Sequence, residues 1–84
     1  MKGNENDRKR LFDEANLLLF AKHLIAVRKK NGFTQEELSY ASDITLSQIA
    51  RIETARINPG LSTIFKLAKA MKVDLKELFD FQLV

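Results

Sequence analysis

The stretch TQEELSYASDITLSQIARIETARINP, residues 34–59, decides the fold, because its pattern predicts two short helices joined by a tight turn. Thr34 can cap the first helix, and Glu37 follows three residues later, in the spacing of a capping box. Asp43 then interrupts the helical pattern. Aspartate is one of the few residues other than glycine that tolerate the left-handed conformation of a sharp turn.

The second helix of this stretch has an apolar inner edge and a mostly hydrogen-bonding outer edge. Thr45 is its expected N-cap, and Ile49 and Ile52 are three residues apart, so they face the same side. The outer edge carries Leu46, Ser47, Gln48, Ala50, Arg51 and Thr54. A short helix of this form after a tight turn is typical of the recognition helix of a helix-turn-helix.

This part of the chain resembles the lambda-repressor-like, XRE-type helix-turn-helix family, and the similarity runs without a gap from about Phe20 to Leu78. The matching positions are Arg28, Gly32, Thr34–Leu38, Ser47, Ile49, Arg51–Glu53, Asn58–Pro59, Thr63, Leu67–Ala70 and Val73. The family usually has glycine where Asp43 and Ala55 stand. The resemblance implies an all-α, five-helix, lambda-repressor-like domain with its helix-turn-helix at the second and third helices.

Composition limits the function further. Eighty-four residues form one small domain, and the absence of cysteine excludes disulfides and zinc–cysteine sites, which suits a reducing cytoplasm. The chain has no signal-like N-terminus and no run long enough to span a bilayer, so we expect no membrane partner. The net charge of +3 permits a polyanionic partner without requiring one.

The chain divides into a polar N-terminal tail and a helical domain. We predict a flexible tail over residues 1–14 and a DNA-binding domain with a C-terminal dimerisation helix over residues 15–84. The tail contains the basic cluster Arg8-Lys9-Arg10. Two interpretations of this cluster stay open: a solvated terminus, or an arm that touches phosphates beside the main site.

The first helix starts between Leu11 and Asn16 by its spacing, and Gly32 ends it. Its inner stripe consists of Leu17, Phe20, Ala21, Leu24, Val27 and Arg28. We expect His23, which has no carboxylate or cysteine at ligand spacing, to face solvent rather than to bind a metal.

An unpaired charge on the buried stripe is costly, so Arg28 requires a partner. Glu53 is the best candidate, because its spacing from Ile49 and Ile52 puts it on the inner side of the recognition helix. The family resemblance implies the same structural ion pair. The alternative is that both side chains lie on the surface.

Two more helices are expected after the loop of residues 55–61, with Ser62 and Asp74 as their N-caps. The last ten residues are rich in apolar side chains, and ordinary core packing can absorb Leu75 and Leu78. The remainder would leave an exposed patch larger than soluble monomers usually tolerate. We therefore predict a homodimer whose interface contains Phe79, Phe81, Leu83 and, at its edge, Ile25.

No arrangement of residues indicates catalysis, a cofactor or a metal, so we do not expect an enzyme. The outer edge of the recognition helix offers base contacts through Leu46, Ser47, Ala50 and Arg51. Arg51 could equally hold a phosphate. Phosphate contacts are expected, in part by the resemblance, from Gln35, Thr45, Gln48, Thr54, Arg56 and Asn58.

The resemblance implies a sequence-specific regulator of transcription that binds double-stranded DNA as a homodimer on a palindromic operator. Small family members of this type include phage-type repressors and controller proteins of restriction–modification systems. RNA polymerase is a possible further partner. The alternative is a protein-interaction module, such as an antitoxin subunit with a toxin partner, in which DNA binding is secondary.

Overall fold

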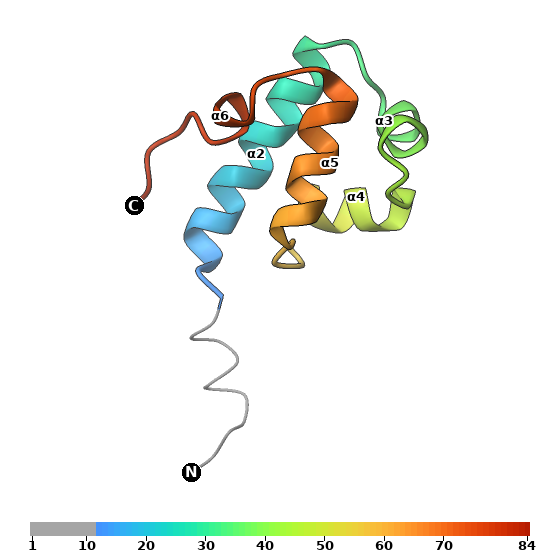
Figure 1. Cartoon of the computed structure of the whole chain (residues 1–84). Helices are drawn as coiled ribbons and strands as arrows, with labels where there is room; N and C mark the ends of the chain where they lie inside the picture. The colour runs from blue at the N-terminus through green and yellow to red at the C-terminus, as the bar shows by residue number, and fades with distance from the viewer. Residues whose placement is uncertain (1–11) are drawn as a thin grey trace.

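The computed structural model describes residues 12–84 and consists, over that range, of five α-helices without a strand (Figure 1). The helices are α2 (Glu14–Lys30), α3 (Gln35–Ser42), α4 (Leu46–Glu53), α5 (Leu61–Met71) and α6 (Leu75–Leu78). This arrangement confirms the predicted all-α, five-helix fold. The basic cluster and most of the predicted tail lie outside the described residues.

The first described helix begins at Glu14, inside the predicted window, because Asp13 caps it. Asp13 accepts hydrogen bonds from the backbone N–H of Asn16 at 3.2 Å and from its side-chain amide at 2.7 Å. Hydrogen bonding to Asn16, first from its side chain and then from its backbone, lowers the pKa of the Asp13 carboxyl. The predicted end of the tail, residue 14, is thus the first residue of α2.

Asn16 also ties the end of the chain to the start of α2. Its side-chain oxygen accepts from the Val84 N–H at 2.9 Å, and its side-chain nitrogen lies 3.3 Å from the Val84 carbonyl oxygen. The C-terminal segment after α6 therefore runs back beside α2, as Figure 1 shows.

Left-handed residues end most of these helices. Gly32 (φ +82°) follows α2 and Asp43 (φ +60°) follows α3, as predicted for both. Ala55 and Lys72 adopt the same conformation after α4 and α5, each with φ +58°. Backbone hydrogen bonds from the residues at these ends turn back to the last helical turn and satisfy carbonyls that the helix leaves free.

The N-caps are only partly as predicted. Thr34 and Glu37 form the expected capping box, and Thr45 accepts from the Gln48 N–H at 3.1 Å. Ser62 is not a cap: α5 starts at Leu61, with Gly60 in the cap position. The Ile64 N–H bonds the Gly60 carbonyl at 3.2 Å, so the helix begins one turn before Ile64 enters the core.

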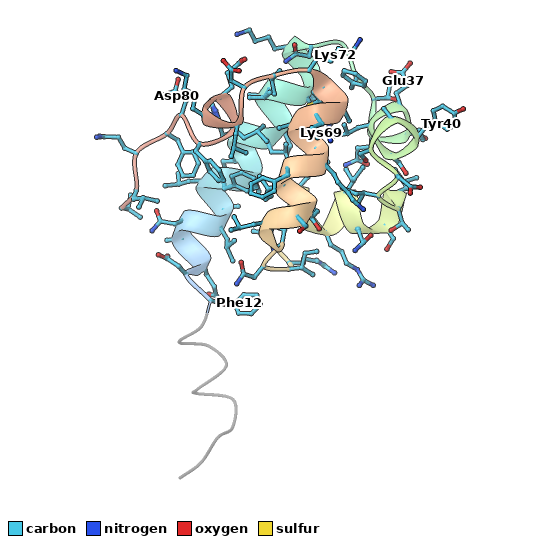
Figure 2. The ribbon with its side chains drawn as sticks, viewed as in Figure 1. Phe12, Glu37, Tyr40, Lys69, Lys72 and Asp80 are labelled. Atoms are coloured by element: carbon cyan, nitrogen blue, oxygen red, sulfur yellow. The ribbon has the colours of Figure 1, made fainter. Side chains whose placement is uncertain are left out.

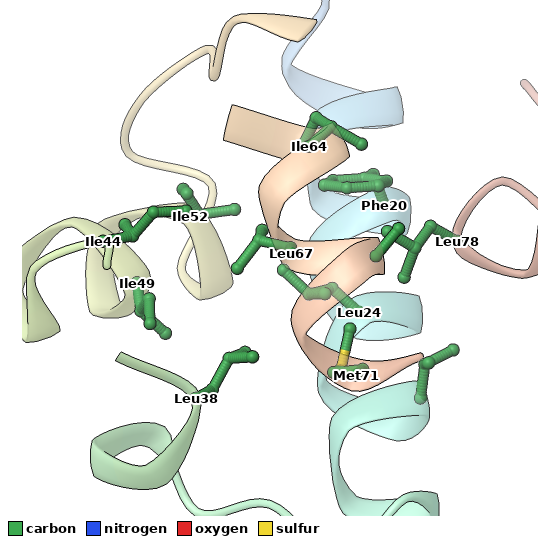
Figure 3. Packing of buried hydrophobic residues seen from close by; sticks show 12 residues of the cluster. Phe20, Leu24, Leu38, Ile44, Ile49, Ile52, Ile64, Leu67, Met71 and Leu78 are labelled. Atoms are coloured by element: carbon green, nitrogen blue, oxygen red, sulfur yellow. The ribbon is translucent and has the colours of Figure 1, made fainter. Parts of the chain in front are cut away.

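Helix α3 packs against α4 and α5, α2 packs against α4 and α6, and the core lies among these helices. Its members are Phe20, Leu24, Val27, Leu38, Ile44, Ile49, Ile52, Ile64, Leu67, Ala68, Met71 and Leu78. Leu67 lies between the isoleucines of α4 and Leu24 of α2 (Figure 3). Leu78 is fully buried, but Leu75, expected in the core, is 36% exposed, because α6 is a single turn with one inward position.

Two side chains expected at the surface instead pack inside the C-terminal region. His23 is half-buried, and its Nε2 lies 2.5 Å from the Glu77 carbonyl oxygen. Phe81 is also half-buried: its ring centre is 5.8 Å from that of His23 and 6.2 Å from that of Phe20. The chain after α6 thus places the Phe81 ring against those of Phe20 and His23, so neither His23 nor Phe81 is fully exposed.

Replacing Ala55 by glycine should stabilise the protein. A non-glycine residue in the left-handed conformation costs about 1–2 kcal/mol, which glycine avoids. The greater freedom of glycine in the unfolded chain offsets about 0.4–1 kcal/mol of this gain. We expect Ala55→Gly to raise the free energy of unfolding by about 0.5–1 kcal/mol in urea melts. Ala41→Gly, inside α3 at an exposed helical position, is the control and should lose about 0.5–1 kcal/mol. A loss at both positions contradicts this account of Ala55.

Candidate nucleic-acid interface

Helix α4 buries one edge and exposes the other, as the sequence predicts for a recognition helix. Ile49, Ile52 and Glu53 are buried. On the opposite edge Leu46, Ser47 and Arg51 are exposed, together with Gln48 and Thr54, and Ala50 is half-buried. The helix thus presents one cation, two hydroxyls, one amide and aliphatic groups, which are side chains that can meet the edges of base pairs.

The beginning of α3 is the second part of the interface. The Thr34 hydroxyl accepts from the Glu37 N–H at 3.0 Å, and the Glu37 carboxylate accepts from the Thr34 N–H at 2.9 Å. This box closes the helix start, and Gln35 is the first helical residue. The backbone N–H groups of a first turn, aligned with the helix dipole, favour an anionic group such as phosphate.

A buried ion pair connects α2 to α4, and this confirms the pairing predicted from the sequence. The Arg28 Nε and Nη2 atoms donate to the two carboxylate oxygens of Glu53 at 2.6 and 3.0 Å. Arg28 is 8% and Glu53 6% exposed. Arg28 Nη1 also donates to the Phe33 carbonyl at 2.9 Å, so the pair holds the start of the helix-turn-helix as well.

Sequence reasoning missed a further member of this cluster. Gln35 Nε2 donates to Glu53 Oε1 at 2.8 Å, so the side chain expected to hold a phosphate is already bonded to the ion pair. Gln35 and Glu53 are 18 residues apart, on different helices. Only the relative placement of α3 and α4 brings them together, and no local pattern indicates it.

Two hydroxyls predicted to contact phosphate are occupied within their own helix. Thr54 Oγ1 donates to the Ala50 carbonyl oxygen at 2.8 Å, with the Arg51 carbonyl oxygen 3.3 Å away. Thr45 Oγ1 accepts from the Gln48 N–H and lies 3.3 Å from Gln48 Oε1. A phosphate contact from either hydroxyl requires it to exchange one of these partners.

Charge is unevenly distributed around the two helices. Arg51 on α4 and Arg56 in the following loop are exposed, and Asn58 is exposed beside them in sequence. Helix α3 carries only acidic ionised groups, and Figure 2 shows Glu37 and Tyr40 pointing outward from it. Among α3, α4 and the loop that follows, the exposed cations are therefore Arg51 and Arg56.

The predicted dimer residues occupy different environments. Leu83 is 72% exposed and Phe79 44%, whereas Ile25 and Phe81 are half-buried. Leu61 (65%) and Phe65 of α5, which the sequence analysis did not include, are exposed one helical turn apart. An open, largely apolar groove of about 340 Å³ lies between the start of α2, the start of α5 and the C-terminal segment, lined in part by Leu17, Phe20, Pro59, Leu61, Phe79 and Leu83.

Over residues 12–84, no three metal-binding side chains of the His, Cys, Asp or Glu types gather closely enough to hold an ion. In the same range, no helix has the length and apolar character to cross a lipid bilayer.

Comparison with known proteins relates this geometry to a family. A family model described as "Helix-turn-helix" matches residues 24–78. The fold superimposes on the crystal structure of the restriction-modification controller protein C.AhdI from Aeromonas hydrophila with a TM-score of 0.76 and 33% sequence identity. That similarity covers 79% of this chain and 96% of C.AhdI.

Two similar sequences belong to a control protein and to a transcriptional regulator. Control protein C.BamHI of Bacillus amyloliquefaciens is 35% identical over 65 residues, which are 76% of this chain and 80% of C.BamHI. The HTH-type transcriptional regulator PuuR of Escherichia coli is 34% identical over 59 residues. These residues are 70% of this chain, but the match spans only 32% of PuuR.

Removing one partner of the buried ion pair should strongly destabilise the domain. Arg28→Met leaves a buried carboxylate unpaired and Glu53→Gln leaves a buried guanidinium unpaired, and we expect each to cost about 3–5 kcal/mol in denaturant melts. Lys30→Met is the control, because Lys30 Nζ lies 3.9 Å from Glu77 Oε2 in an exposed pair. It should cost less than about 1 kcal/mol. If Arg28→Met and Glu53→Gln also cost less than about 1 kcal/mol, burial does not make this ion pair more important for stability than an exposed one.

Proposed function

Because this chain belongs to the XRE-type helix-turn-helix family of DNA-binding transcriptional regulators, we propose that it binds double-stranded DNA sequence-specifically, as a homodimer on a palindromic operator. The observation that supports this most is the exposed edge of α4, with Ser47 and Arg51 free of the core that holds Ile49 and Ile52. Regulation then follows from occupancy of the site, in the manner of a repressor or controller protein.

In this proposal α4 enters the major groove. Leu46, Ser47, Ala50 and Arg51 meet base edges there, and a guanidinium is suited to bidentate contact with guanine O6 and N7. Aliphatic groups such as Leu46 and Ala50 suit a thymine methyl. The exposure of three of these four side chains supports this assignment.

Phosphate contacts would surround this row. The first turn of α3, with Gln35, points its backbone N–H groups toward the helix start, and Arg56 supplies the charge beside Asn58. Thr45, Gln48 and Thr54 complete the proposed set at the two ends of α4. Such contacts set the register and orientation of the domain on the duplex, whereas the base contacts carry the sequence preference.

One domain reaches only a few base pairs, and such small interfaces discriminate weakly against the many competing sites of a genome. A two-fold dimer doubles the contacts and reads half-sites about 34 Å apart. The proposed interface centres on Phe79 and Leu83, which are exposed beside the groove, with Phe81 behind them and Ile25 at the edge. Leu61 and Phe65 extend the same apolar surface.

DNA recognition is tested by binding titrations and by selection from random duplexes. The unaltered chain should bind a duplex with a steep dependence on salt. We expect Arg51→Ala to lose about 1–3 kcal/mol on the selected site and to relax the preference at one base pair. Gln35→Ala should weaken binding to all sequences about equally.

Lys76→Ala on α6 removes one exposed positive charge away from α4 and is the matched control, with little effect expected. If Arg51→Ala keeps the full preference at every base pair, Arg51 contacts a phosphate and not a base. No binding of the unaltered chain at low salt would favour the protein-interaction module instead.

The dimer is tested by sedimentation at micromolar concentration, where we expect a two-chain species. Leu83→Asp should give a folded monomer, because Leu83 is 72% exposed in one copy; Phe79→Asp should also dissociate the dimer but lose some stability, because the Phe79 ring lies 5.7 Å from that of Phe20. Their operator affinity should fall, since each copy then binds its half-site alone. Tyr40→Asp, at a 93% exposed aromatic on α3, is the control and should remain a dimer. A persistent monomer of the unaltered chain would refute the assembly.

A further inference from the structure

The Glu53 carboxylate accepts a hydrogen bond that the ion pair does not require. Arg28 already donates to each of its oxygens, at 2.6 and 3.0 Å, and the Glu53 side chain is only 3% exposed. Gln35 Nε2 adds a third donor, at 2.8 Å from Oε1. A hydrogen bond to an ionised acceptor is stronger than one between neutral groups, so this contact holds the Gln35 side chain in one orientation.

The contact joins the start of α3 to the end of α4, which are the two ends that the connecting turn does not link. Residues 43–45 link the end of α3 to the start of α4, whereas Gln35 opens α3 and Glu53 closes α4. The Gln35–Glu53 bond therefore joins the opposite ends. It fixes the position of the Gln35 amide relative to α4 as well as relative to α3.

Part of the Gln35 amide remains available. Nε2 carries two hydrogens and one goes to Glu53, while Oε1 has no hydrogen-bond partner found within residues 12–84. A long side chain loses rotamer freedom when it binds a ligand, and a side chain already held in place loses less. Gln35 is thus prepared to donate its second N–H to an outside acceptor.

We propose that Glu53 is a positioning residue for DNA binding, which holds the Gln35 amide so that its second N–H meets a DNA phosphate. This inference rests on the function proposed above. Arg28 has a defined part in it: its charge neutralises the carboxylate, so the group that orients Gln35 places no net negative charge beside the phosphate.

A double-mutant cycle on DNA affinity tests the inference. The background variant is Arg28→Met/Glu53→Leu, because replacing both partners of a buried pair by apolar residues of similar volume often preserves stability. On a mixed-sequence duplex of about two helical turns, Gln35→Ala should weaken binding of the unaltered chain about three- to tenfold, as for one lost hydrogen bond. In the background variant the same change should have almost no effect.

Asn58→Ala is the matched control, since Asn58 is another proposed phosphate contact and makes no hydrogen bond to Glu53 in the described chain. Its effect should be equal in both backgrounds. An equal effect of Gln35→Ala in both backgrounds would overturn the positioning role while leaving DNA binding intact. Failure of the unaltered chain to bind the duplex would instead refute the function itself.

Nuclear magnetic resonance of the unaltered chain gives a second readout that does not depend on the background variant folding. One side-chain proton of Gln35 should exchange slowly with water, because it is bonded to Glu53. The other should shift when the duplex is added. A Gln35 amide whose two protons exchange rapidly and do not respond to DNA would contradict the inference.

Discussion

The ion pair between Arg28 and Glu53 is the interaction on which the helix-turn-helix of this domain depends. Helices α3 and α4 have eight residues each, and isolated helices of that length are not stable in water. Their orientation must come from tertiary contacts. Apolar packing supplies most of the stability, but the hydrogen bonds of the pair have directions, and they join α2, the Phe33 carbonyl, the start of α3 and the end of α4.

The same pair shows how a buried charge can be tolerated in a small core. Its two charges satisfy each other, and the remaining Arg28 nitrogen reaches a backbone carbonyl. No buried polar side-chain atom in the described chain lacks a hydrogen-bond partner. One edge of α4 is therefore fixed by both apolar and polar contacts, and the other edge remains free for a partner.

Local signals in the sequence were sufficient for much of this architecture. The Thr34 capping box, the left-handed Asp43 and the Arg28–Glu53 pair each follow from spacing and from the cost of an unpaired charge. Two local predictions, the Ser62 cap and a buried Leu75, were wrong. The errors at His23 and Phe81 concern contacts between distant residues. His23 meets the Glu77 carbonyl across 54 positions, and the path of the chain after α6, which no periodicity describes, decides whether Phe81 is covered.

The Asn16 side chain bonds Asp13 and both backbone groups of Val84, so it belongs to the start of α2 and to the end of the chain at once. We therefore expect fraying of the first turn of α2 and detachment of the C-terminal segment to be coupled. Amide hydrogens near Asn16 should then exchange with solvent at rates that depend on how firmly the C-terminal segment is held. Whatever binds that segment will also protect the helix start next to residues 1–11.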